Sequence, residues 1–357
     1  MKYICPKCKR VSVDGNIWCQ EKFCPAENSL EIFNNGEWFG NIEIIEVFSI
    51  LRSSILYRAI REGQNIILKI ANEGCEERLK REARLLSSLT DKSQHPMLPI
   101  LLSAHEQASV KEFPYSKLVV NGKTRYYEIF DDVEGETLRN LLIKNPQPWY
   151  KHVGWIVISL CDVLLLIHQS NHLHLCINPE TVILRFDKEN IPRPVLIDLG
   201  IADKAENIQF SWDERFTFPA YTAPELIQME GKVGAATDVY GVGLLLYEML
   251  AGQPAYPYEL RKDEEIYQAI QSGVFSQTGR TDLINIPQIA ESTIQKDYDL
   301  RPKDIRTLVL KLMQNFSSVP KEKVKRKFNW QLFSIVIGVL LAISLLLVLA
   351  LVISEST

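Results

Sequence analysis

Four cysteines near the start of the chain have the type and spacing of a metal site. Cys5 and Cys8 are separated by two residues, and Cys19 and Cys24 follow after ten more, with four residues between them. Thiolates are soft ligands, and two close pairs of them can surround one tetrahedral Zn²⁺ ion at ~2.3 Å per Zn–S bond. Because four protein ligands leave no coordination position open, we expect a structural zinc site.

Residues 1–40, which contain these cysteines, resemble a zinc ribbon. They hold little apolar material, so metal binding would supply their folding energy. A redox C-x-x-C motif is the alternative, and it needs a thioredoxin-like strand–helix context that the pattern does not show. Glu21, Glu27 and Glu31 dilute the basic residues, which argues against nucleic acid as a partner. We expect this segment to share no core with the rest of the chain and to unfold alone when the metal is lost.

The composition is that of an ordinary globular chain. Its 357 residues are 46% hydrophobic and 24% charged, with a net charge of −4, which excludes collagen-like and wholly disordered classes and gives no global field for nucleic acid. The remaining cysteines, Cys75, Cys161 and Cys176, are scattered singly. The first residues have no apolar run of the kind found in a cleaved signal peptide. We therefore expect the thiols to be reduced. The length of the chain indicates two domains, or one large domain with additions.

Residues 41–316 change from strand-like to helical patterns along the chain. The amphipathic helix expected over residues 75–90 carries Leu79, Ala83, Leu86 and Leu89 on one face. The other expected elements are strands over residues 42–60 and 66–70 with a turn at Gly63, a hairpin over 117–130 through Asn121-Gly122, and helices over 155–169 and 238–250. Strands first and helices later indicate an α+β domain with two lobes.

Eight motifs in this stretch, taken in chain order, resemble those of the eukaryotic-type Ser/Thr protein kinase family. They are Ile66-Ile67-Leu68-Lys69, Glu82 within KREA, His95-Pro96, residues 133–138 (VEGETL), residues 196–200 (LIDLG), Ala223-Pro224-Glu225, residues 237–243 (TDVYGVG) and Arg301-Pro302. One tripeptide is weak evidence, but the order and spacing together imply the two-lobed protein-kinase-like fold. The resemblance places the hinge between the lobes near residues 130–133.

The resemblance implies that three residues hold a nucleotide. Lys69 matches the lysine that contacts the phosphates of ATP, Glu82 matches the helix glutamate that pairs with it, and Asp198 matches the aspartate that binds Mg²⁺. It also implies two supporting contacts, from Asp238 to the catalytic loop and between Arg301 and Glu225.

The catalytic loop departs from the family pattern at the positions that act on substrate. Residues 174–181 (HLCINPET) align with H-R-D-x-K-P-x-N, so the catalytic aspartate falls on Cys176. The phosphate-contacting lysine falls on Asn178, the asparagine that holds a second Mg²⁺ falls on Thr181, and the arginine falls on Leu175. No catalytic residue is intact in this loop, which predicts loss of phosphoryl transfer.

The phosphate-binding loop shows a second departure. Kinases cover the phosphates with G-x-G-x-x-G because glycine lets backbone N–H groups approach closely. Here Ser49, Leu51 and Ser54 stand at those positions, and the threonine expected before Ala-Pro-Glu falls on Phe218. We therefore predict that ATP with Mg²⁺ binds weakly or not at all.

Other chemistry in the catalytic loop is not expected. A cysteine has a pKa of ~8.5, so Cys176 would need strong activation to act as a base near neutral pH. A Cys–His pair with His174 is the nucleophilic alternative, but the resemblance implies a structural role for that histidine. Glu180 is common at its position in active kinases and does not replace the aspartate.

Two functions follow as alternatives. The first is a pseudokinase, a signalling or scaffold module that binds cytosolic protein partners. The second is an active ATP-dependent Ser/Thr kinase with a degenerate loop, in which Lys69, Glu82 and Asp198 would still hold a nucleotide with one Mg²⁺. Nucleic-acid binding through the ribbon is a third and more remote interpretation.

Residues 332–353 carry no charge and are long enough to cross a membrane as a helix. At 1.5 Å per residue they would extend about 33 Å, against ~30 Å for the hydrocarbon core, and a buried soluble helix is the alternative. Residues 321–327 hold five positive charges and one negative charge, which predicts that the N-terminal side is cytoplasmic.

We therefore expect a single-pass, tail-anchored membrane protein with its N-terminal bulk in the cytoplasm. Its basic juxtamembrane linker would cover residues 317–331, and a short extracytoplasmic tail would cover residues 354–357. Ser334, Gly338 and Ala342 share a helix face, and small residues at this spacing let two membrane helices approach closely. A homodimer through this face and a chance occurrence of small residues are both left open.

Overall fold

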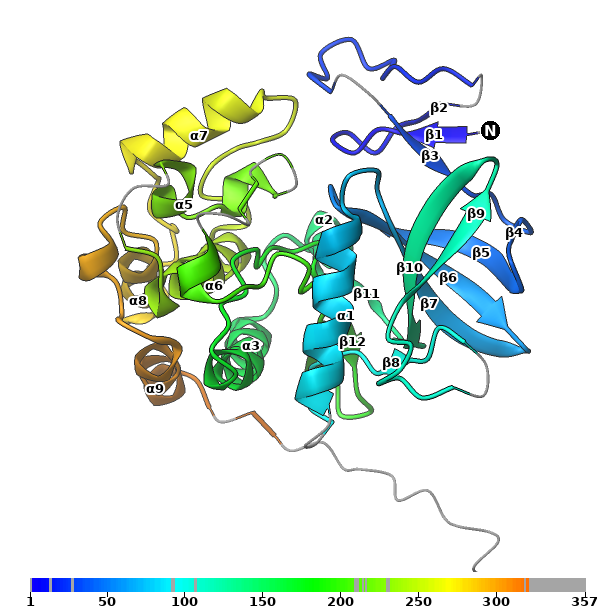
Figure 1. The fold of residues 1–357 in the computed structure, drawn as a ribbon. Helices are drawn as coiled ribbons and strands as arrows, with labels where there is room; N and C mark the ends of the chain where they lie inside the picture. The colour runs from blue at the N-terminus through cyan, green and yellow to red at the C-terminus, as the bar shows by residue number, and fades with distance from the viewer. Residues whose placement is uncertain are drawn as a thin grey trace, which may run out of the picture. The chain divides into compact units, whose positions relative to one another are not determined.

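The structure is a computed structural model, shown in Figure 1. It describes residues 2–12, 15–26, 29–90, 94–105, 108–208, 212–213, 215, 217–228, 232–317 and 319–320. The predicted membrane helix with Ser334, Gly338 and Ala342, most of the basic linker and the tail lie outside the described residues. The chain divides into two compact units, Met1–Val319 and Pro320–Thr357, and every element below belongs to the first.

An antiparallel seven-stranded sheet forms the first lobe. Its strand order is β4-β5-β6-β7-β10-β8, and β9 pairs with β10. The strands are β4 (Trp38–Phe39), β5 (Ile42–Ile50), β6 (Ser54–Arg61), β7 (Gln64–Ala71), β8 (Leu101–Leu102), β9 (Ser116–Val120) and β10 (Lys123–Asp131). The predicted hairpin is confirmed, because β9 and β10 meet at Asn121-Gly122. Both residues have the positive φ, 51° and 75°, that a two-residue turn of this type requires.

Helix α1 (Glu76–Thr90) packs against the sheet of the first lobe (Figure 1). The predicted face of Leu79, Ala83, Leu86 and Leu89 is buried, as the 3.6-residue period of the sequence requires. The same face carries Glu82, which is also fully buried. A carboxylate in such a place needs a cationic partner, because burying an unpaired charge is costly.

The second lobe is mostly helical and is built around α3 (Tyr150–Gln169) and α6 (Ala235–Ala251). Both helices begin earlier than predicted, because their first turns carry polar or small residues that give a weak periodic signal. Around them lie α2 (Leu138–Lys144), α5 (Pro224–Gln228), α7 (Asp263–Ser272), α8 (Ile286–Thr293) and α9 (Ile305–Asn315), with a small sheet of β11 (Glu136–Thr137), β12 (Val182–Phe186) and β13 (Pro192–Leu196). Strands and helices thus segregate into two lobes, as expected for an α+β domain.

Helix α3 is long and apolar enough that it could cross a membrane by length and composition alone. It is the one such helix within the described part of the chain, and 61% of its most apolar window is buried inside the protein. It contacts α6, α9 and β13. It is therefore a core helix of the second lobe in this structure.

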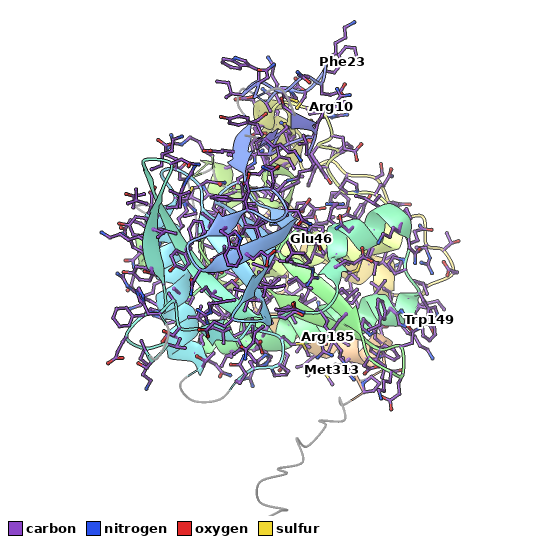
Figure 2. All side chains as sticks on the ribbon, turned by 90° about the vertical axis from the view of Figure 1, so that its right-hand side faces the viewer. Arg10, Phe23, Glu46, Trp149, Arg185 and Met313 are labelled. Atoms are coloured by element: carbon purple, nitrogen blue, oxygen red, sulfur yellow. The ribbon has the colours of Figure 1, made fainter. Side chains whose placement is uncertain are left out.

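The cysteine-rich segment forms its own three-stranded sheet of β1 (Lys2–Ile4), β2 (Val11–Ser12) and β3 (Leu30–Ile32), in the order β2-β1-β3. Its buried residues Ile4 and Ile32 belong to the same apolar cluster as Phe39, Ile42 and Tyr57 of the first lobe. The expectation that the segment shares no core with the rest is therefore wrong. Two isoleucines cannot make a core alone, so they pack onto the neighbouring sheet. Figure 2 shows Arg10 and Phe23 projecting at the outer end of the segment.

Candidate functional site

Lys69, Glu82 and Asp198 meet at one point although they come from β7, α1 and the loop after β13. Lys69 Nζ donates hydrogen bonds to Glu82 Oε2 and, at 2.7 Å, to Asp198 Oδ1. The three residues are buried, with 1%, 0% and 4% of their surface exposed. The structure thus brings together the residues that the sequence pattern assigned to a nucleotide, but covers them with protein atoms.

Glu128 is a fourth member of this cluster, and the sequence analysis missed it. It lies on β10 directly opposite Lys69 on β7, and its Oε1 is 3.7 Å from Lys69 Nζ. Burial, and then the charge of Glu82, raise the pKa of Glu128 well above its ordinary value, so it is much harder to ionise than an exposed glutamate. The available signal was one acidic residue inside the apolar stretch 126–130 (YYEIF), a position that favours a buried partner.

The charge state of Lys69 follows from the same contacts. Burial alone would lower its pKa, but the charges of Asp198 and Glu82 outweigh burial and raise it. The lysine therefore stays protonated, and one cation serves three buried carboxyl groups. Such a cluster stabilises the fold only while all its members are present.

The backbone of the catalytic loop is held by Asp238, near the start of α6. Its carboxylate accepts hydrogen bonds from the N–H groups of His174 at 2.8 Å and Leu175 at 2.7 Å, and it contacts His168 Nε2 at 2.7 Å. Burial alone would raise the pKa of Asp238. The hydrogen bonds from His168 and from the backbone of the catalytic loop outweigh burial, so the pKa lies below its usual value. This is the supporting contact that the resemblance implied.

The second implied contact is also present. Arg301 donates to both carboxylate oxygens of Glu225, at 2.8 and 2.9 Å, and both side chains are buried. Bidentate pairs of this kind are among the stronger hydrogen-bonded contacts in proteins. The framework around the catalytic loop is therefore intact.

Cys176 stands where the catalytic aspartate is expected, and its environment does not activate it. Only 6% of its surface is exposed, and burial raises the pKa of its thiol to about 12. His174 Nδ1 accepts a hydrogen bond from the backbone N–H of Cys176 at 3.3 Å, and burial lowers the pKa of this histidine. The imidazole is thus oriented by the backbone, which argues against a Cys–His nucleophilic pair.

The other two altered positions stabilise the loop itself. Asn178 Nδ2 donates to Cys176 O at 3.1 Å, and Asn178 Oδ1 accepts from the N–H of Glu180 at 3.0 Å. Thr181 Oγ1 donates to Asn178 O at 2.9 Å. Both residues are buried, at 2% and 0% exposure. Their polar atoms are satisfied within the loop instead of facing a ligand.

Glu180 is likewise engaged within the protein. Its Oε1 accepts from Arg139 Nε at 3.1 Å. Arg139, on α2, also donates to Glu248 at 2.7 Å and to the Tyr221 hydroxyl at 2.8 Å. An acidic group beside the catalytic loop is therefore bound to an internal cation, which the sequence analysis did not foresee.

Apolar side chains near the positions expected for the phosphate-binding loop are buried. Leu51, at the turn between β5 and β6, is 6% exposed, and Leu56 on β6 is fully buried. They share one continuous core with Phe130 of the first lobe and with Ile183 and Ile197 of the second. Ser49 and Ser54, at two of the expected glycine positions, are buried as well. The residues present keep the lysine pair for ATP with Mg²⁺ but do not fit the rest of that group.

The four N-terminal cysteines come together as predicted by their spacing. Their sulfur atoms all lie within 4.8 Å of one another, and Cys5–Cys24 and Cys8–Cys19 are 3.7 and 3.4 Å apart. A tetrahedral ion with Zn–S bonds of ~2.3 Å places its sulfurs about 3.8 Å apart. All four are free thiols. The cluster is a possible metal site whose donors suit zinc.

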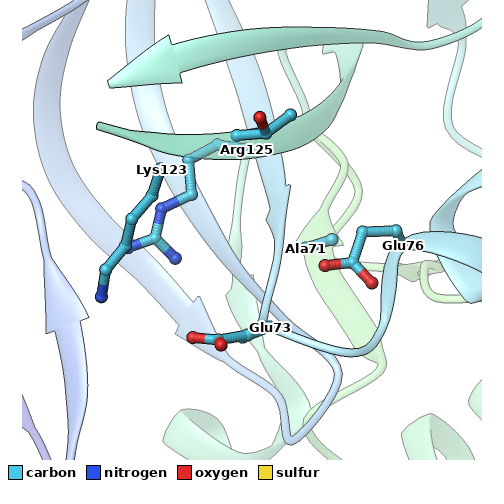
Figure 3. A pocket seen from close by; sticks show the side chains of 6 residues that line it. Ala71, Glu73, Glu76, Lys123 and Arg125 are labelled. Carbon is cyan, nitrogen blue, oxygen red and sulfur yellow. The ribbon is translucent and has the colours of Figure 1, made fainter. Parts of the chain in front are cut away.

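A cavity of about 230 Å³ lies on the first lobe, away from these groups. Figure 3 shows the charged side chains of Glu73 and Glu76 facing those of Lys123 and Arg125 across it, with Ala71 nearby. None of the cluster residues around Lys69 lines it. The acidic and basic side chains that line the cavity compensate one another's charge, which is typical of a solvated surface.

Comparison with known proteins agrees with the two-lobed fold. Residues 54–318 match the model of the protein kinase domain. A probable serine/threonine-protein kinase, KIN1 homolog, from Encephalitozoon cuniculi is 26% identical over 254 residues, which cover 67% of this chain and 39% of that protein. Calcium-dependent protein kinase 13 from Arabidopsis thaliana is 24% identical over 239 residues, covering 64% and 43%.

Serine/threonine-protein kinase DCLK3 from Mus musculus is also similar, at 26% identity over 160 residues, covering 44% of this chain and 19% of that protein. This chain thus spans less than half the length of each of these relatives. The matched region includes β6, α1, the catalytic loop and α9. The chain therefore belongs to the protein kinase domain family.

Proposed function

We propose that this chain is a pseudokinase: a membrane-anchored protein-kinase-like domain that acts as a signalling or scaffold module and binds cytosolic proteins. One observation carries the proposal. The groups that would act on a nucleotide are either replaced, as at Cys176, Asn178 and Thr181, or enclosed in the protein, as at Lys69 and Asp198. Catalysis of phosphoryl transfer depends on positioning and charge at these places.

The experiment that tests this proposal is a phosphoryl-transfer assay on the full-length chain. With radiolabelled ATP and Mg²⁺, we expect no transfer to the chain or to a generic protein substrate above background. Thermal unfolding with micromolar ATP should show no shift, because Ser49, Leu51 and Ser54 stand where the family has the glycines that let backbone N–H groups approach the phosphates. Transfer that is abolished by Lys69→Ala would contradict the proposal. A Mg²⁺-dependent shift that is lost in Asp198→Asn would contradict the prediction of weak or absent nucleotide binding and would make the chain a nucleotide-regulated switch.

An active Ser/Thr kinase is the second candidate. The observation in its favour is the intact set of Lys69, Glu82 and Asp198, joined by hydrogen bonds, which active members use to hold ATP with Mg²⁺. Phosphoryl transfer that is abolished by Lys69→Ala distinguishes this function from a pseudokinase.

The proposal includes a structural zinc ion in the ribbon, held by Cys5, Cys8, Cys19 and Cys24. The support is the mutual distance of the four sulfurs. Metal analysis of the purified chain should find one zinc per chain, lost in Cys5→Ser with Cys8→Ser. Because Ile4 and Ile32 are part of the first-lobe core, we now expect metal loss to lower the stability of that lobe as well. An absence of zinc, or zinc that survives both substitutions, would count against this site.

The proposal further divides the chain into a zinc ribbon (residues 1–40), a kinase-like domain (41–316), a basic linker (317–331), a membrane helix (332–353) and a tail (354–357). The support is the uncharged stretch and the basic residues before it. Removal of residues 332–357 should release the chain to the soluble fraction in high salt, which screens the basic linker. A truncated chain that stays with membranes in high salt would place the anchor elsewhere.

Whether Ser334, Gly338 and Ala342 support a homodimer is decided by crosslinking the full-length chain in membranes.

A further inference from the structure

A turn of the ribbon reaches both lobes of the kinase-like domain. This turn, residues 5–10 between β1 and β2, is called here the cysteine knuckle. Lys7 Nζ lies 2.9 Å from Asp263 Oδ1, in the first residue of α7. Arg52, in the turn between β5 and β6, donates to the same carboxylate at 2.5 and 3.0 Å. One aspartate of the second lobe is thus shared by the ribbon and the first lobe.

The knuckle also contacts the cleft side of the first lobe through Lys9. Its Nζ donates to Ile50 O at 2.8 Å, at the end of β5, and to Pro6 O at 2.9 Å. The two lysines of the knuckle therefore reach α7 of the second lobe and the end of β5 in the first lobe.

The cysteines determine where these lysines point. Lys9 has a φ of 60°, in the left-handed region that residues with side chains rarely adopt. Its N–H donates to Cys5 O at 3.0 Å, and the N–H of Cys5 donates to Arg10 O at 3.0 Å. This tight turn encloses Cys5 and Cys8. A metal ion that binds the two thiolates would therefore fix the backbone that carries Lys7 and Lys9.

The contact between the knuckle and α7 is polar and partly open. A cavity of about 710 Å³ lies beside it, lined by Pro6, Lys7, Pro25, Arg52, Arg215 and Asp263. The side chains of Lys7, Arg52 and Asp263 are 15%, 21% and 30% exposed. Ion pairs with this exposure are individually weak, so the contact can open without unfolding either lobe.

We propose that the cysteine knuckle is a reversible latch across the mouth of the cleft, closed through Asp263 and dependent on the metal held by the four cysteines. This dependence rests on the zinc site proposed above. In the closed state the knuckle lies against the ion pair that joins Arg52 of the first lobe to Asp263 of α7. Loss of the metal makes displacement of the knuckle from Asp263 easier.

Two buried cysteines of the chain serve as reporters of the latch. Cys176 lies in the catalytic loop and is 6% exposed, whereas Cys161 lies in the core helix α3 and is fully buried. Both are free thiols. Opening of the cleft exposes Cys176 alone, while unfolding of the second lobe exposes both. Alkylation of the full-length chain by N-ethylmaleimide, followed by mass spectrometry of the two peptides, measures the ratio of their rates.

The variant Lys7→Glu places like charges at the contact with Asp263, and Lys2→Glu, at an exposed position on β1, is the matched control. We expect Lys7→Glu to raise the alkylation rate of Cys176 relative to Cys161 by about fivefold or more, the factor that corresponds to about 1 kcal/mol. Lys2→Glu should leave the ratio unchanged. Chelation of the metal in the unaltered chain should raise the ratio as Lys7→Glu does. The milder Asp263→Asn should give a smaller increase.

Two outcomes overturn the latch: an unchanged ratio in Lys7→Glu, or equal increases at Cys176 and Cys161, which would indicate general loosening. Failure of the zinc site is a separate result. If the purified chain holds no zinc, or if chelation leaves the ratio unchanged while Lys7→Glu raises it, the metal dependence is wrong. The comparison of Lys7→Glu with Lys2→Glu still decides the latch itself, because neither residue is a metal ligand.

Discussion

The cluster around Lys69 and the catalytic loop around Cys176 face the same cleft, yet they differ in what has been retained. In the cluster, Lys69, Glu82 and Asp198 all match the family and are buried in mutual contact. In the loop, the residues that would act on substrate are replaced by groups that bond to one another. Removing one member of a buried ion cluster leaves an uncompensated charge. The difference predicts that the cluster contributes to folding stability, separately from any role in catalysis.

The largest effect should come from breaking the cluster. In Lys69→Met, Glu82, Glu128 and Asp198 lose their shared cation, so we expect the free energy of unfolding to fall by about 3–5 kcal/mol. Chemical denaturation of the full-length chain measures the loss, with Lys117→Met at an exposed position on β9 as the control. A loss below ~1 kcal/mol would mean that folding does not explain why the cluster is retained.

A smaller effect should follow from weakening the support of the catalytic loop. Asp238→Asn keeps the shape but replaces one acceptor by a donor facing the buried N–H groups of His174 and Leu175. An unsatisfied buried group costs about 1–3 kcal/mol, and we expect a loss in that range. The same denaturation measurement applies. A neutral result would show that the loop does not depend on its framework.

The third prediction concerns the proton of Glu128. Its pKa is raised in the folded chain, whereas in the unfolded chain it ionises near pH 4.3. As pH rises above that value, ionisation of Glu128 stabilises the unfolded state but not the folded state, so the native chain loses stability. Glu128→Gln removes this loss. We expect the variant to be more stable than the native chain by about 1–2 kcal/mol at pH 6 and to show no such gain at pH 4. Parallel stability curves for the two proteins would contradict the assignment.

The smallest effect is expected in the loop itself. Cys176→Ala removes a thiol whose hydrogen bonds, with Asn178 Nδ2 at 3.4 Å and with the backbone of Phe218, are those of a weak sulfur acceptor. The stability should therefore change by about 1 kcal/mol or less. Thermal unfolding and the radiolabel assay together test this, and phosphoryl transfer should remain at background. A large loss of stability would make Cys176 a structural requirement and would weaken the contrast between the two regions.

Much of the framework could be predicted from local patterns. The buried face of α1 follows from its helical period, and the β9–β10 hairpin follows from Asn121-Gly122. The closeness of Lys69 to Asp198, and that of the four cysteines, was inferred from motifs. These signals lie in neighbouring residues or in a fixed order along the chain, so no knowledge of packing was needed.

Other features depended on contacts between distant segments. Glu128 meets Lys69 through the register of β10 against β7, and Arg139 meets Glu180 and Glu248 through the packing of α2 in the second lobe. Neither pair has a spacing that a pattern could identify. The expectation that the ribbon has no core in common with the first lobe was wrong for the same reason. Ile4 and Ile32 are only two residues, and their shared core with the first-lobe sheet is visible only in the folded structure.

The sequence by itself therefore determined the family, the order of the elements and the residue types at the positions of the catalytic loop, because these are properties of residue type and spacing. Only the tertiary structure decided which of the family-matching residues are enclosed and what the cysteine knuckle contacts. The physical reason is that burial and charge compensation are set by side chains that are distant in sequence, such as Lys7 and Asp263. Whether a conserved lysine binds a ligand or neutralises its neighbours is a question of surroundings, which the order of residues does not contain.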